Sequence, residues 1–302
     1  MLSLTGYVDL PAHAEGGFDH GDVHRATGRV FVAHTANGTV EVIDAAASRH
    51  IATLPDCPEA SGVLCAQEAG LVFAAARANG RVLVIDPLTR QVTAILDAGQ
   101  RPNGLAWDSQ RQRLLVADVG DNQARLVDLT AATVVVIIEL PGRPRWCVYD
   151  PNADMFFINI REPALVVKLD AATGSRISAY GVASAGPHGL DLDERQRRLF
   201  VACDGGQVVI LDADGGEELG IVPIPGVPDA IWFDAAREFL FVAIGEPGVL
   251  TVVDTAAGTV AEEIITEPGA QTTAFDPVRQ RLYVFLPRTC RAAVYQVEEK
   301  PG

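Results

Sequence analysis

Several kinds of residue and segment are scarce in this sequence, and each scarcity argues against a class of protein. The 302 residues include five cysteines, an odd number without a CxxC pair, which is typical of neither a disulfide framework nor a zinc knuckle. We therefore expect buried, reduced thiols. The most apolar run, Thr133 to Leu140, is strand-length and falls far short of the roughly 20 residues of a membrane-spanning helix.

Targeting signals and basic residues are also scarce. The N-terminus lacks the basic segment, the apolar segment and the cleavage site of a signal peptide, so we expect a cytoplasmic protein, or a periplasmic one if a leader has been removed. The 24 Lys and Arg residues face 39 Asp and Glu, which gives a net charge of −15. Nucleic acid is therefore disfavoured as a partner, because an acidic chain would have to hold a polyanion.

An internal repeat of 42 residues runs through the chain. An apolar stretch ending in Asp recurs six times at this spacing, and one further step reaches Gln296 in AVYQV. The six aspartates are Asp44, Asp86, Asp128, Asp170, Asp212 and Asp254. Seven units of 42 residues account for 294 of the 302 residues, so we expect one domain over residues 1–302.

Each unit is predicted to form four short strands. In the third unit they cover Asn103–Asp108, Arg113–Asp118, Ala124–Asp128 and Thr133–Leu140. Short apolar and β-branched runs between Gly, Asn, Asp and Pro are typical of antiparallel sheet. Four-stranded units of this length are the blades of a β-propeller. The predicted fold class is all-β: a seven-bladed β-propeller of four-stranded antiparallel blades.

The turns and the chain ends fit this architecture. Asn37-Gly38 and Asn79-Gly80 predict two-residue type I′ turns between the second and third strands. The repeated Asp is expected to close an Asx-turn on the backbone that follows it. The last unit has only three clear strands, so we expect Leu4–Leu10 at the N-terminus to complete the seventh blade and close the ring.

The repeat pattern resembles the YncE-like, YVTN-repeat family of propellers over essentially the full length. The resemblance lies in GRVFVAHTANGTVEVID, RLLVADVGDNQARLVD, RLFVACDGGQVVILD and RLYVFLPRTCRAAVYQV, although the literal YVTN tetrapeptide is absent. This resemblance implies the fold and says little about function, because propellers serve in binding, scaffolding and catalysis alike.

Polar residues of several blades are predicted to meet at one end of the central channel. In a propeller, the start of each first strand and the end of each second strand reach the same face. Aligning the units places Asp19, His20, Asn103, Arg145, Trp146, His188 and Asp229 at first-strand starts, and His34, Asp118, Cys203 and Asp204 at or after second-strand ends. We call this end of the channel the mouth.

Five of these residues are candidate metal ligands: Asp19, His20, His34, Asn103 and His188. Neutral imidazoles beside carboxylates suit Zn, Fe, Ni or Cu, and all-oxygen sets suit Ca or Mg. A divalent metal, Zn, Fe, Mn, Ni or Ca, is therefore a possible cofactor. Two other interpretations stay open, namely a metal-free pocket and a wet mouth whose polar residues are merely solvated. No organic cofactor is indicated.

A second resemblance concerns the segments RPNGLAWD (101–108) and GPHGLDLDERQRRLFVACDGGQVVILD (186–212), which look like blades of the SMP-30/gluconolactonase superfamily. Those propellers hold a divalent cation at the channel mouth with Glu, Asn and Asp and open lactones. By this resemblance, Asn103 matches the asparagine of the family's PNG motif, and His188 stands where the family has the aspartate of PDG. Asp19 stands where the first-blade glutamate begins the first strand.

Two functions follow as hypotheses. The first is a propeller that binds a small molecule, a metal ion or a protein partner at its mouth, as a monomer. The second is a divalent-metal-dependent lactonase, hydrolase or lyase, with Asp118, Asp204 or Asp229 as general base and Arg145 orienting an anionic substrate. A further alternative makes Cys203 a nucleophile activated by His188 of the same blade.

Overall fold

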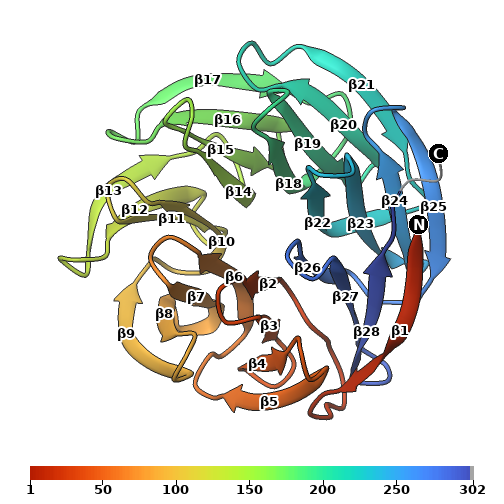
Figure 1. Cartoon of the computed structure of the whole chain (residues 1–302). Helices are drawn as coiled ribbons and strands as arrows, with labels where there is room; N and C mark the ends of the chain where they lie inside the picture. Colours follow the sequence, from red (N-terminus) through yellow and green to blue (C-terminus); the bar gives the residue numbers. More distant parts are fainter. Residues whose placement is uncertain (300–302) are drawn as a thin grey trace.

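A computed structural model describes residues 1–299, which form seven four-stranded antiparallel sheets arranged radially around a central axis (Figure 1). Blades 1 and 2 comprise β2 (Gly21–His24), β3 (Arg29–His34), β4 (Thr39–Asp44) and β5 (Arg49–Leu54), then β6 (Ala60–Ala66), β7 (Leu71–Ala76), β8 (Arg81–Asp86) and β9 (Gln91–Asp97). Blades 3 and 4 comprise β10 (Pro102–Asp108), β11 (Arg113–Asp118), β12 (Gln123–Asp128) and β13 (Thr133–Glu139), then β14 (Pro144–Asp150), β15 (Met155–Ile160), β16 (Leu165–Asp170) and β17 (Arg176–Gly181).

Blades 5 and 6 comprise β18 (Pro187–Asp193), β19 (Arg198–Cys203), β20 (Gln207–Asp212) and β21 (Glu218–Pro223), then β22 (Val227–Asp234), β23 (Phe239–Glu246), β24 (Val249–Asp254) and β25 (Thr259–Ile265). Blade 7 contains β26 (Thr272–Asp276), β27 (Arg281–Leu286), β28 (Arg291–Val297) and the N-terminal β1 (Leu2–Asp9). The all-β propeller predicted from the repeat is therefore confirmed.

The N-terminal strand closes the ring, as predicted. β1 pairs antiparallel with β28, with Leu2 opposite Val297 and Asp9 opposite Arg291 (Figure 1). Blade 7 thereby gains its fourth strand, and the sheet edge at β28 is covered.

The apolar core lies between the blades rather than within one centre. Each of seven buried clusters joins residues of two adjacent blades, for example Phe31 and Val42 of blade 1 with Leu83 of blade 2. The three inner strands of each blade are buried on both faces, because a neighbouring blade covers each face. This packing fixes the inner strands, and the channel-facing side chains are held on them.

Turn chemistry explains the repeated Asp. The carboxylate of Asp44 accepts backbone hydrogen bonds from Ala46 and Ala47, each at 2.9 Å. The other five repeated aspartates make the same kind of contact. The Asx-turn prediction is therefore confirmed.

The type I′ prediction for Asn37-Gly38 and Asn79-Gly80 is wrong. Only the glycines have positive φ, at 64° and 70°, whereas Asn79 ends a short 3-10 turn (Arg77–Asn79). The loops are longer than two residues, so a helical turn absorbs the reversal and a left-handed glycine ends it.

Two further expectations concern the thiols and the membrane. All five cysteines are free, and four of them are buried: Cys57, Cys65, Cys147 and Cys203. Within residues 1–299, no helix has the length and apolar character needed to cross a membrane.

Candidate functional site at the channel mouth

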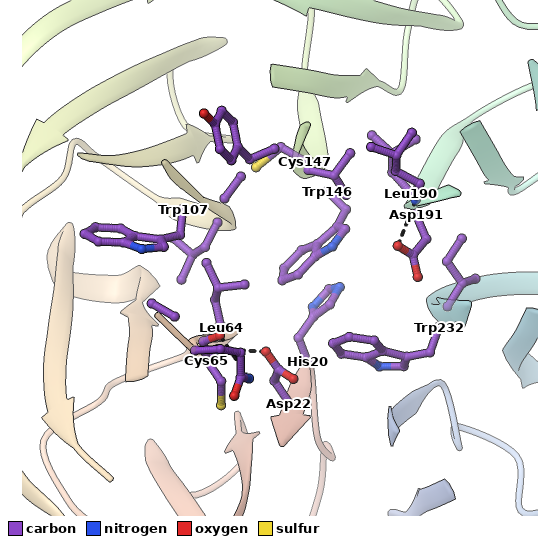
Figure 2. Close-up of a pocket in the computed structure, with 18 of the residues that line it drawn as sticks. His20, Asp22, Leu64, Cys65, Trp107, Trp146, Cys147, Leu190, Asp191 and Trp232 are labelled. Atoms are coloured by element: carbon purple, nitrogen blue, oxygen red, sulfur yellow. Dashed lines mark hydrogen bonds between the residues drawn. The ribbon is translucent and has the colours of Figure 1, made fainter. Parts of the chain in front are cut away.

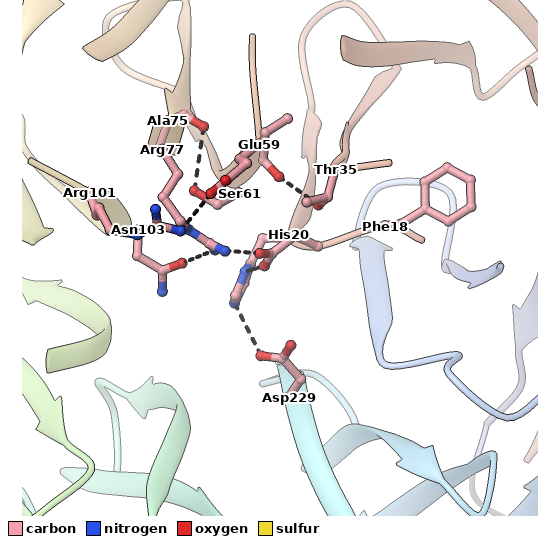
Figure 3. Close-up of polar contacts among 12 residues, drawn as sticks. Phe18, His20, Thr35, Glu59, Ser61, Ala75, Arg77, Arg101, Asn103 and Asp229 are labelled. Carbon is pink, nitrogen blue, oxygen red and sulfur yellow. Dashed lines mark hydrogen bonds and ion pairs between the residues drawn. The ribbon is translucent and has the colours of Figure 1, made fainter. Parts of the chain in front are cut away.

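The mouth is built where the inner strands begin and where the second strands end. Six blades contribute polar side chains to it, and the network runs through hydrogen bonds and ion pairs (Figure 3). The start of each inner strand lies at the rim, so side chains there extend toward the channel instead of packing fully between blades.

An arginine joins two of the predicted metal ligands. Nη2 of Arg77 donates to Asp19 Oδ2 at 2.7 Å and to Asn103 Oδ1 at 2.5 Å (Figure 3). Asp19 and Asn103 are thus brought together, as the sequence predicted. The positive charge between them, however, is the guanidinium of Arg77.

A second group surrounds the carboxylate of Asp229. Its Oδ1 lies 3.0 Å from Nε2 of His188 and 3.9 Å from Nε2 of His20. The guanidinium of Arg145 lies against Nε2 of His188. Two predicted ligands and one predicted base therefore meet, and again an arginine supplies positive charge beside them.

The polar network continues from His188 to Asp204 in blade 5 and to Arg161 in blade 4. His188 Nδ1 lies 3.0 Å from Asp204 Oδ1, and Arg161 contacts Asp204 Oδ2 at 2.7 Å. Burial lowers the pKa of His188, but the charge of Asp229 and the contacts with both aspartates outweigh burial, so its pKa lies above 6.5. Both ring nitrogens face carboxylates, so His188 links Asp204 to Asp229, with the Arg145 guanidinium also against Nε2.

Three mouth carboxyls, those of Asp19, Asp204 and Asp229, have lowered pKa values. Burial raises the pKa of Asp229, yet the charges of His188, His20 and Arg145 more than reverse this, and its pKa lies far below 3.8. The pKa of Asp204 is lowered against burial mainly by His188. The pKa of Asp19 is lowered against burial mainly by His20. These groups are weak bases, since a general base needs a pKa near the working pH.

Arginines dominate the rest of the mouth. Burial lowers the pKa of Arg143, and the nearby charges of Arg161, Arg77 and Arg101 lower it further. Burial also lowers the pKa of Arg145, with a further lowering by Arg143 that Asp229 opposes. Mutual repulsion among the five guanidiniums shows that positive charge is concentrated here in a chain of net charge −15.

His34 does not join the mouth network. Its side chain is fully buried, with Nδ1 at 3.1 Å from Glu41 Oε1, Nε2 at 2.7 Å from His13 Nδ1, and its ring stacked on Phe18. The side chains of β3 alternate between the two faces of the blade, and His34 follows Val32 toward blade 7. The expected grouping of His34 with His20 and His188 is therefore wrong.

Two other predicted residues are placed where they cannot perform the predicted role. Asp118 is fully buried and accepts hydrogen bonds from Arg125 Nη1 and from three backbone N–H groups. Its carboxylate therefore holds the loop before β10 in place and is not available as a general base. Cys203 is fully buried, and burial raises the pKa of its thiol to about 12, the opposite of what a nucleophile requires.

The predicted metal ligands lie among arginine side chains. In the part of the chain that the structure describes, no group of three or more His, Cys, Asp or Glu side chains is arranged so that it could hold a metal ion. The physical reason at Asp19, Asn103 and His188 is that Arg77 and Arg145 lie among the donors. A cation entering there would face two guanidiniums.

Sequence reasoning missed four of the mouth arginines: Arg77, Arg101, Arg143 and Arg161. A register signal could have found them. Arg77 and Arg161 each stand two residues after the position aligned with the second-strand end of their blade, which is Ala75 or Asn159, and Arg288 stands two residues after Leu286 in the same way. Arg101 and Arg143 each stand two residues before the residue aligned at the first-strand start, which is Asn103 or Arg145.

Comparison with solved structures shows the same fold. "Kuenenia stuttgartiensis Hydrazine Synthase" matches with a TM-score of 0.85 and 13% identity over 95% of this chain and 97% of that chain. A chain of the "Crystal Structure of Mitotic Checkpoint Complex" matches with a TM-score of 0.84 and 13% identity over 98% of this chain and 92% of that chain. No protein-family model and no curated protein matches. The YncE-like and SMP-30/gluconolactonase resemblances therefore stay predictions.

Proposed function

We propose that this β-propeller binds a small anion, a carboxylate- or phosphate-bearing molecule, at the channel mouth. The observation that carries the proposal is the concentration of five arginines around the mouth of an acidic chain, close enough to depress the pKa of Arg143. Guanidinium groups bind carboxylate and phosphate through paired, charge-assisted hydrogen bonds.

The ion-pairing pattern distinguishes Arg143 from the other three loop arginines of the mouth. Arg77, Arg101 and Arg161 each have a carboxylate partner, in Asp19, Glu59 and Asp204 respectively. Arg143 is exposed and has no ion-pair partner among residues 1–299. The charge of Asp204 acts on Arg143 but is outweighed by burial and by the other arginines, so an anion placed beside Arg143 would relieve this repulsion.

The mouth also offers space for a molecule. A cavity of about 720 Å³ opens at this face, lined by Asp19, Arg77 and Arg288 among others; Arg77 is the member of the five-arginine group that lines it, and Arg143 lies outside its wall. This volume lies within the range of small-molecule sites, roughly 300–1,000 Å³.

Isothermal titration calorimetry with inorganic phosphate and with citrate, at low ionic strength, tests the proposal. We expect binding to the wild type and about tenfold weaker binding to Arg143→Gln, since one charge-assisted contact is lost. Arg195→Gln is the matched control, because Arg195 is a largely exposed arginine in the turn before β19, on the opposite face. Absence of binding by the wild type, or equal affinity in Arg143→Gln, would contradict the proposal.

The metal-dependent hydrolase or lyase is a separate hypothesis that the same preparation tests. One equivalent of bound metal by mass spectrometry, together with lactone hydrolysis that a chelator abolishes, would favour it. Phosphate binding that survives chelator treatment would favour the arginine site instead.

A further inference from the structure

The other end of the channel holds a cavity of a different kind. A space of about 300 Å³ is enclosed by the inner strands of blades 1 to 6 (Figure 2). His20 and Trp146 are its residues nearest the mouth, and they stack across the channel with ring centroids 3.9 Å apart and an interplanar angle of 4°. We call the space beyond this stack the channel cavity.

Aromatic and aliphatic side chains form most of its wall. The chain has three tryptophans, and all three line this one cavity: Trp107, Trp146 and Trp232. Leu64, Leu105, Leu190 and Ile231 complete the apolar surface. Aromatic faces carry negative charge density at their centres and attract cations within about 6 Å.

Two carboxyls stand at equivalent positions in this wall. Asp22 and Asp191 each lie three residues beyond the mouth residue of their own blade, in blades 1 and 5. Asp22 accepts backbone hydrogen bonds from Val23 at 2.6 Å and from Cys65 of blade 2 at 2.7 Å.

Asp191 repeats this arrangement four blades further round, between blades 5 and 6. It accepts backbone hydrogen bonds from Leu192 at 2.8 Å and from Phe233 of blade 6 at 2.7 Å. Each oxygen of the two carboxyls thus accepts one bond, and each retains a lone pair for another donor.

Neither carboxyl has a cationic partner. Across residues 1–299, no Lys, Arg or His forms an ion pair with Asp22 or Asp191, although Asp22 is only 6% exposed. Buried carboxylates are normally paired.

We propose that the channel cavity binds a small organic cation, an amine or quaternary ammonium group carried on an apolar body. The indole faces contact the cation and its body, and Asp22 and Asp191 balance its charge. The other charged side chains of the wall also favour a cationic ligand. Two of them, Glu68 and Glu194, are acidic, whereas Arg25 is the one arginine among the lining residues in the described part of the chain and His20 lies on the mouth side.

The protonation of the two carboxyls makes cation binding at this cavity depend on pH. Burial raises the pKa of Asp22 to about 7, against its backbone hydrogen bonds and Arg25. Burial also raises the pKa of Asp191 to about 7, and Asp22 and Glu194 add to this. A bound cation favours the ionised carboxylates, so binding should release protons below pH 7. The thiols of Cys65 and Cys147 have pKa values raised by burial and stay neutral, as does Tyr149.

Intrinsic tryptophan fluorescence tests the proposal directly, because every tryptophan of the chain lines this cavity. Benzyltrimethylammonium is the probe, with benzyl alcohol and benzoate as its neutral and anionic counterparts. We expect the cation to change the emission with a Kd below about 1 mM at pH 8. At pH 5.5 we expect binding to be weaker by about tenfold or more, with proton release measured by calorimetry in two buffers of different ionisation enthalpy.

Variants separate charge from folding. Asp191→Asn should weaken cation binding by about tenfold, and Glu246→Gln, an exposed acid on the mouth side, should leave it unchanged. If Asp191→Asn is unfolded by circular dichroism, the wild-type comparison of the three probes still decides. No fluorescence change with the cation, or equal affinity for benzyl alcohol and for the cation, would overturn the proposal.

Discussion

The carboxyl groups at the two ends of the channel differ in their ion pairing and in the direction of their pKa shifts. At the mouth, Asp19, Asp204 and Asp229 are paired with arginine and histidine, and their pKa values are lowered. In the channel cavity, Asp22 and Asp191 have backbone donors but no cation, and burial raises their pKa values to about 7.

The difference follows from which part of the blade faces each end. The mouth is bordered by loops before the first strands and after the second strands, and these loops supply Arg77, Arg143 and Arg161. The cavity is bordered by strand interiors, where neighbouring blades leave room for apolar and aromatic side chains. Loops therefore supply Arg77 and Arg161, the counter-charges of Asp19 and Asp204, and strand ends supply His188 for Asp229. The carboxyls deeper in the channel, Asp22 and Asp191, have no ion-pair partner among residues 1–299.

The largest expected effect is an opposite pH dependence at the two ends. A carboxyl whose pKa is raised on folding contributes stability below its unfolded value, near 3.8, and this is lost as pH rises through about 7. For Asp22 the shift of about three units corresponds to up to about 4 kcal/mol at 1.36 kcal/mol per unit. The mouth carboxyls act in the reverse sense, since their contribution is lost as pH falls below 4.

Urea unfolding between about pH 2 and pH 8 measures this contrast, since the mouth carboxyls titrate below pH 4 and Asp22 above it. Asp22→Asn should flatten the decline in free energy of unfolding between pH 4 and pH 7, because the amide does not titrate. Asp97→Asn is the control, since the side chain of Asp97 is 94% exposed at the end of β9, and its pH profile should match the wild type. Identical profiles for Asp22→Asn and the wild type would contradict the prediction.

Removing a mouth carboxylate should be nearly as costly. Asp229→Ala leaves Arg145 and His188 facing each other without the carboxylate between them, and we expect a loss of about 3–5 kcal/mol in unfolding free energy. It should also lower the pKa of His188, which two-dimensional NMR of the imidazole protons would follow. A loss below about 1 kcal/mol, with an unchanged His188 titration, would show that the pairing is incidental.

The smallest effect concerns the stack that divides the two ends. Trp146→Phe should reduce the ring overlap with His20 and cost about 1 kcal/mol. A double-mutant cycle with His20→Leu isolates the stack from the contact of His20 with Asp19, and thermal unfolding of the four proteins provides the values. A coupling free energy near zero would mean that the two rings merely lie side by side.

Most of the fold could be predicted from the sequence, because the 42-residue period and the strand pattern act together. The strand Arg113–Asp118 was predicted with the bounds it has, and the closing role of the N-terminal strand follows from a count of strands in the last unit. The turn at Asn37-Gly38 was mispredicted, since the dipeptide alone does not reveal the length of its loop.

The candidate site could be predicted only in part. Aligning the blades located Asp19, His20, His188 and Asp229 at one rim, because inner-strand starts share a face. The alignment could not show that His34 turns between two blades, since side-chain direction depends on strand register to a single residue. Nor could it show that arginines from neighbouring loops occupy the space between the predicted ligands.

The pairing of β1 with β28 also determines when blade 7 can be completed during biosynthesis. Leu2 leaves the ribosome 295 residues (297 − 2) before its partner Val297. At about 5–20 residues per second, the N-terminal strand waits about 15–60 s for that partner. During this interval six complete blades can stack while the ring stays open, so the nascent chain exposes an unpaired strand that a chaperone could protect.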